Sequence, residues 1–127
     1  MSTALQQLAQ QLRDEDTPVS PHVIDPEEAA TFAAPGEYAF VIEAVREGYL
    51  LHYGEPRLLA GHDPDLALLA GDYLYALGIE RLAALGDTKA VHELADLIST
   101  CAQLHTEGRA DEVPIAWTES IRAIAGT

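Results

Sequence analysis

The residue best placed to do chemistry in this 127-residue chain is a lone carboxylate, Asp72. It is the only charged residue in the apolar segment from Leu66 to Ile79. Taking a carboxylate out of water costs several kcal/mol unless the group is paired. We therefore expect Asp72 to be a buried polar residue that pairs with a tyrosine or arginine of a neighbouring helix. A catalytic acid is the alternative interpretation.

Two further pairs have a spacing that suits two metal ligands on one helix face. His92 and Asp96 lie four residues apart, as do Cys101 and His105. The first pair lies on a polar helix face and the second on an apolar stripe, so the four side chains do not converge. We therefore expect no metal site. Cys101 has no basic neighbour in sequence that would activate it as a thiolate, so we expect a buried thiol.

The elements that must position these residues are helices. Alanine and leucine dominate, and no segment alternates cleanly between apolar and polar residues. We predict an all-α fold, a compact bundle of about five helices in a single domain, residues 1–127. The expected helices cover 2–14, a short stretch from Asp25 to before Pro35, 36–53, 64–85, 87–106 and 113–125. Residues 14–26 contain two prolines before Pro26 and are expected to form an exposed linker.

The charge of the chain limits its partners. Seven basic residues against 21 acidic ones give a formal net charge of −14, which repels phosphate backbones and anionic membrane surfaces. We expect no nucleic-acid binding. The longest apolar stretch is shorter than the ~20 residues that span a bilayer, so we expect no membrane span. A single cysteine and the lack of a signal-peptide pattern at the N-terminus suit the cytoplasm.

The helix from Pro64 to Leu85 carries the strongest indication of function. Between residues 66 and 79 it is apolar nearly all round, which is typical of a helix at the centre of a bundle or against a partner. A chain of this size has little protein with which to cover such a helix. We therefore predict a protein partner or a homo-oligomer, with an interface formed by Leu66, Leu69, Tyr73 and Leu77.

Part of the chain resembles one known family. The stretch Leu69-Ala70-Gly71-Asp72-Tyr73-Leu74, the later Gly86-Asp87 turn, and the helix from Val91 to a terminal Glu107-Gly108 are similar to the central helices of trans-polyprenyl diphosphate synthases. The similarity covers about a third of the chain, and the L-A-G-D-Y element is its most specific part. It implies an isoprenoid-synthase-like helical fragment.

The sequence also departs from that family. The helix ahead of the L-A-G-D-Y element would end in an H-D-D-x-x-D motif that binds magnesium diphosphate, whereas this chain has His52-Tyr53-Gly54-Glu55-Pro56-Arg57. The second aspartate-rich helix of the family is absent as well. The pattern is closest to the small, non-catalytic subunit of heterodimeric long-chain prenyl diphosphate synthases. This resemblance implies a chain that is not an enzyme by itself and that sets product length together with a catalytic partner.

Three hypotheses follow. The chain is a non-catalytic accessory subunit of a prenyl diphosphate synthase, or it is a helical accessory or scaffold subunit of an unrelated assembly with no isoprenoid role. The third possibility is a small binder of a metal or an apolar ligand. That binder would use the His92, Asp96, Cys101 and His105 side chains or a tyrosine-rich helix face. We expect no catalytic residues, no cofactor and no phosphate-binding or dinucleotide-binding motif.

Overall fold

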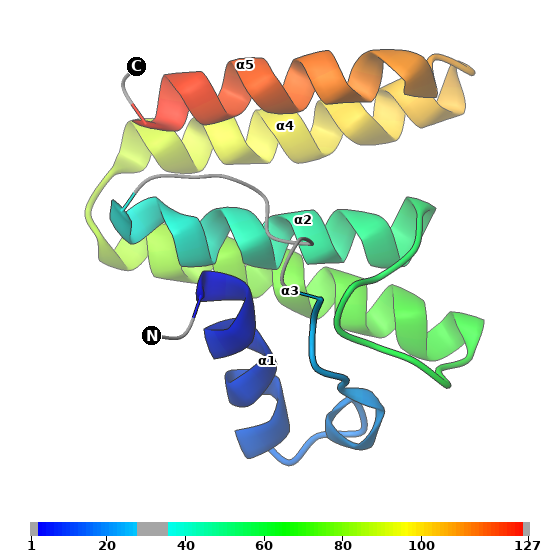
Figure 1. Ribbon diagram of the computed structural model, residues 1–127. Coiled ribbons are helices and arrows are strands. Elements are labelled where there is room, and N and C mark those ends of the chain that lie inside the picture. Colours follow the sequence, from blue (N-terminus) through cyan, green and yellow to red (C-terminus); the bar gives the residue numbers. More distant parts are fainter. Residues whose placement is uncertain (1–2, 28–35, 126–127) are drawn as a thin grey trace. The chain divides into compact units, whose positions relative to one another are not determined.

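The computed structural model describes residues 3–27 and 36–125, and it divides into two compact units, Met1–Gly78 and Ile79–Thr127. Five α-helices and several short 3-10 turns make up the regular structure of the described residues (Figure 1). The β structure in this part of the chain is one isolated bridge, between Val23 and Leu59. The predicted all-α class is therefore confirmed. The two units are described separately below.

The first unit begins with α1, Ala4–Asp14. Thr3 and Gln6 form a capping box, in which Thr3 Oγ1 accepts from the Gln6 amide at 3.1 Å and Gln6 Oε1 accepts from the Thr3 amide at 2.8 Å. The predicted apolar stripe of this helix is confirmed, because its three leucines at positions 5, 8 and 12 are all buried. This stripe lies against α2.

Helix α2, Ala39–Tyr53, follows a 3-10 turn at Gly36–Tyr38 and matches the expected helix over 36–53. It is antiparallel to the first part of α3, Pro64–Ala84, and three glycines allow the two helices to approach closely (Figure 1). A Cβ on Gly48 would lie 2.9 Å from the carbonyl oxygen of Gly71, and a Cβ on Gly78 would lie 2.5 Å from a methyl group of Val45. These contacts give Gly71 of the L-A-G-D-Y element a packing role.

Helix α3 has 21 residues, close to the predicted 64–85, and its inner face lies in the apolar core of the unit. The core residues it contributes are Ala67, Ala70, Leu74 and Leu77. None of the helices in the described ranges has the combination of length and apolar character needed to cross a membrane. The face of α3 that lies outside this core is described below.

The segment from 14 to 26 is held to the unit by backbone pairing. It contains a 3-10 turn at Ser20–His22, and the Ile24 amide donates to the Leu58 carbonyl at 2.7 Å, while the Ala60 amide donates to His22. Val19 is buried in this stretch, whereas most of its neighbours are exposed or half-buried. The short helix expected after Asp25 is not present over residues 25–27, and its remainder lies outside the described residues.

The second unit contains the end of α3 and a helical hairpin of α4, Thr88–Thr106, and α5, Val113–Ala125. Both hairpin helices match the expected ranges. The predicted N-cap is confirmed, because the Asp87 side chain accepts from the Ala90 amide at 2.9 Å. Gly108, with φ +72°, ends α4 in the left-handed conformation that favours glycine. The buried faces of the two helices pack on each other around Trp117.

Candidate partner interface

One face of α3 in the first unit presents large apolar side chains to solvent. Leu69 is 61% exposed, Leu68 56% and Tyr73 37%. The helical repeat of 3.6 residues places these three positions on the same side, and the exposed Ala76 extends the surface by one turn. We call Leu68, Leu69, Tyr73 and Ala76 the α3 face. Single exposed leucines are common on proteins, whereas contiguous exposed apolar side chains are more typical of interaction surfaces, so the α3 face is the candidate site.

The four residues predicted for the interface are divided between the two sides of the helix. Leu69 and Tyr73 belong to the α3 face, and Leu66 is half-buried against the core of the unit. Leu77 is buried in that core, so its placement at an interface is wrong for the chain in this structure. Leu77 is eight positions after Leu69, which turns its side chain by about 80° around the helix axis, toward the core. Leu68 was not predicted, because a uniformly apolar segment does not indicate which leucines face outward.

Asp72 lies within the α3 face and is not buried. Its side chain is 74% exposed, which corrects the prediction of a buried carboxylate. The partner of Asp72 is a histidine and not the expected tyrosine or arginine. The His52 Nε2 atom lies 3.3 Å from Asp72 Oδ1 and 3.3 Å from the Leu68 carbonyl oxygen. The position follows from the helix geometry, since Leu68 and Asp72 are one turn apart and both face outward. Exposure removes the desolvation cost on which the prediction depended.

Two acidic residues lie within the α3 face. Asp65 is exposed one turn before Leu69, and Asp72 is exposed one turn after Leu68 and lies between Leu68 and Tyr73 in projection along the helix. The Tyr73 hydroxyl donates to a carboxylate oxygen of Glu15, the residue that caps the C-terminus of α1. The part of α3 that belongs to this unit contains no lysine or arginine. The α3 face is therefore an exposed apolar surface that two carboxylates interrupt.

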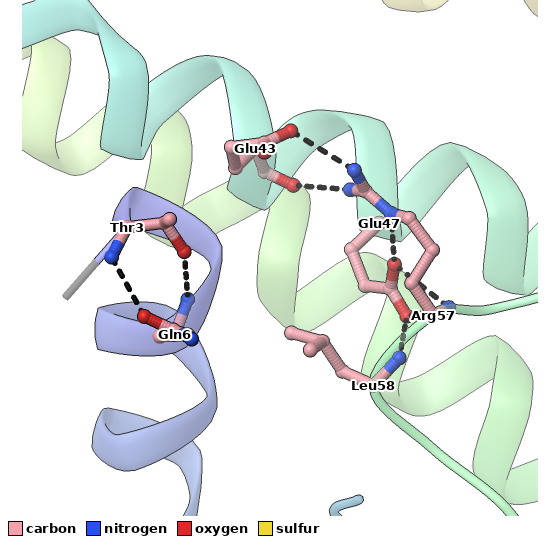
Figure 2. A network of polar contacts seen from close by, with 6 residues as sticks. All are labelled: Thr3, Gln6, Glu43, Glu47, Arg57 and Leu58. Carbon is pink, nitrogen blue, oxygen red and sulfur yellow. Dashed lines mark hydrogen bonds and ion pairs between the residues drawn. The ribbon is translucent and has the colours of Figure 1, made fainter. Parts of the chain in front are cut away.

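A buried ionic network joins α2 to the loop that follows it (Figure 2). The Glu43 and Glu47 side chains are completely buried, and the Arg57 guanidinium joins them. Its Nη1 donates to Glu43 Oε1 at 3.0 Å, and its Nε donates to Glu47 Oε1 at the same distance. Buried charges of this kind are tolerated only when they are paired and hydrogen-bonded.

The network fixes the loop between α2 and α3. Glu47 also accepts from the backbone amide of Arg57, at 2.8 Å to Oε2, and from the amide of Leu58 at 2.9 Å. One carboxylate therefore holds two consecutive backbone amides and one side chain of the loop. This network was not predicted from the sequence. Its signal is a pair of glutamates four residues apart in a largely apolar helix, followed by an arginine ten residues after the second glutamate.

The stretch from His52 to Arg57 is divided between the end of α2 and the loop that the network holds. His52 and Tyr53 end α2, Gly54 caps it, and the Arg57 guanidinium pairs with the two buried glutamates. Glu55 is exposed in this loop.

The other candidate ligands do not form a cluster. His92 Nε2 and Asp96 Oδ2 lie 3.4 Å apart on an exposed face of α4, whereas Cys101 is buried and His105 is half-buried. Within the described residues there is no group of three or more histidine, cysteine, aspartate or glutamate side chains that could hold a metal ion. Tyr49 and Tyr53 stack with ring centroids 5.3 Å apart.

Comparison of the chain with profiles of known protein families, with curated proteins and with solved structures finds no match.

Proposed function

We propose that this chain is a non-catalytic accessory subunit that acts by packing the α3 face against a protein partner. The observation that carries the proposal is the exposure of Leu68, Leu69 and Tyr73 on one side of a helix whose other side is core. A partner that covers these side chains gains about 25 cal/mol for each Å² of apolar surface removed from water. The fixed loop ahead of α3 supports the proposal, because an interface benefits from a surface that is ordered before binding.

We further propose that the partner is the catalytic chain of a polyprenyl diphosphate synthase and that the complex is cytoplasmic. The L-A-G-D-Y element supports this assignment. Its glycine makes a close helix contact, and its aspartate and tyrosine lie at the proposed interface. The non-catalytic role is supported by the paired Arg57, which lies where the family has its first aspartate cluster.

The test is affinity capture of the tagged chain from its native cells, followed by an assay of the captured complex. We expect a larger chain that carries two aspartate-rich motifs, and we expect the complex to elongate prenyl diphosphates. Addition of this chain to the isolated partner should change product length. A partner captured through Leu69 that has no such motifs and no such activity would refute the isoprenoid assignment but not the accessory role.

A second candidate is an accessory or scaffold subunit of an unrelated assembly. One observation favours it. Packing against Gly48 and pairing with His52 account for Gly71 and Asp72 of the L-A-G-D-Y element without any isoprenoid chemistry. The same capture experiment separates the two candidates, because they differ in the identity and activity of the partner and agree on the surface that binds it.

A further inference from the structure

We infer that the occupant of the α3 face is a helix of a different protein, with apolar side chains that lie between two lysine or arginine residues seven positions apart. The inference rests on the proposed function, in that it takes the α3 face to bind a protein. It adds the chemistry of the partner and excludes a second copy of this chain as the occupant.

The spacing of the two carboxylates on the α3 face sets the spacing of the basic residues. Asp65 and Asp72 are seven residues apart, which is two helical turns or about 10 Å along the axis. Both are exposed, and Leu68 and Leu69 lie between them. A partner helix that lies along α3 and fills the space beside the leucines brings its own residues at positions i and i+7 opposite the two carboxylates.

The overall charge favours the same kind of partner. Residues 1–78 contain thirteen acidic residues and three arginines, and no lysine. One of these arginines, Arg57, is held by buried glutamates, and another, Arg13, lies 2.7 Å from Asp25. A basic partner is attracted to this unit from a distance, which raises its association rate at low salt.

A second copy is a poor occupant for the same reasons. A two-fold contact pairs the same patch on both chains, so residue i meets residue j and residue j meets residue i. Centred on the leucines, such a contact places Asp65 of one chain opposite Asp72 of the other. Like charges at an interface select against that partner. The total formal charge of each chain, −14, adds to the repulsion.

The inference is tested with two synthetic helical peptides that share the same leucines and differ at two positions seven residues apart, which are lysine in one peptide and glutamate in the other. Binding to the full chain is measured by fluorescence anisotropy at low and high salt. We expect the lysine peptide to bind, with an affinity that falls several-fold at high salt. We expect the glutamate peptide not to bind. Sedimentation of the chain alone should give a monomer.

Three variants make the test specific to the α3 face. Leu69→Asp should lower the affinity for the lysine peptide at least ~30-fold, as expected for a central apolar contact. The double variant Asp65→Asn, Asp72→Asn should weaken binding of this peptide about fourfold, because the two exposed ion pairs each contribute a factor of about two. The matched control removes the same charge from α5 and its preceding turn, as Asp111→Asn with Glu119→Gln, and should change binding less than about twofold. Circular dichroism verifies that each variant is folded.

Several outcomes would overturn the inference. If both peptides bind equally and Leu69→Asp abolishes both, the α3 face recognises apolar side chains without regard to charge. The basic partner is then rejected, and the proposed docking role remains. Binding of the lysine peptide that ignores Leu69→Asp means that only bulk charge is recognised. A dimer of the chain that dissociates on Leu69→Asp makes a second copy the occupant. The failure of both peptides to bind also rejects the stated partner chemistry.

Discussion

Replacing Glu47 with glutamine tests how the loop ahead of α3 is held. The two oxygens of this carboxylate accept from the Arg57 amide, the Arg57 Nε and the Leu58 amide. Glutamine keeps the shape of the side chain but offers one acceptor oxygen instead of two. Its amide nitrogen must then face at least one N–H group that the carboxylate had satisfied.

The size of the effect follows from this geometry. If the glutamine oxygen takes the place of Oε1, the Leu58 amide loses its acceptor; if it takes the place of Oε2, the Arg57 Nε does. A buried donor without an acceptor costs about 1–3 kcal/mol. The lost charge weakens the hold on the Arg57 cation as well. We therefore expect Glu47→Gln to lower the free energy of unfolding by about 2–4 kcal/mol.

The assay is urea unfolding followed by circular dichroism, together with hydrogen exchange of the Leu58 amide. Local opening that is easier by about 2 kcal/mol speeds exchange of this amide roughly thirtyfold. The matched control is Glu55→Gln, an exposed glutamate of the same loop, which should change stability by less than about 0.5 kcal/mol. If Glu47→Gln unfolds like the wild type and Leu58 stays protected, the network does not hold the loop.

Three further predictions concern the rest of the chain. Gly71→Ala would place a methyl group 2.4 Å from the imidazole ring on α2, and we expect a loss of about 1–3 kcal/mol in urea unfolding. Leu74→Ala should cost about 2–5 kcal/mol because Leu74 is buried, whereas exposed Leu68→Ala should cost less than about 0.5 kcal/mol; similar losses would contradict the two-sided α3. The Arg109 guanidinium donates to Glu112 and lowers the pKa of that carboxyl, which NMR titration should show and Arg109→Gln should abolish. The unfolded chain binds the Glu112 proton more tightly than the folded chain does. The stabilisation is therefore full above the ordinary glutamate pKa and is lost as pH falls through the lowered pKa of the folded chain.

The sequence predicts the helices well where periodicity and end signals agree. The Asp87 cap and the glycine that ends α4 mark both ends of that helix, and the leucines of α1 identify its buried stripe. The expected helix after Asp25 is not seen over residues 25–27, although the aspartate-proline pattern is present there. The rest of that expected helix lies outside the described residues.

The candidate interface is harder to predict, because an apolar helix contains no signal for its own orientation. The composition around Asp72 indicated burial, but the direction of this residue depends on which side of α3 meets α2. The glycine contacts at positions 48, 71 and 78 decide that side. The buried glutamates were missed for a related reason. Charged residues are expected at the surface, and only the position of Arg57 in three dimensions shows that they are compensated.

The central claim is that the α3 face is covered by another protein in the cell. The most direct measurement is photo-crosslinking from a reactive amino acid placed at position 69. Position 115 on α5 is the matched control, because Ile115 is also apolar and is exposed to the same 61%. We predict that position 69 crosslinks to one dominant protein in native cells. Position 115 should not crosslink to that protein. Equal crosslinking from both positions, or crosslinks from position 69 only to a second copy of this chain, would contradict the account.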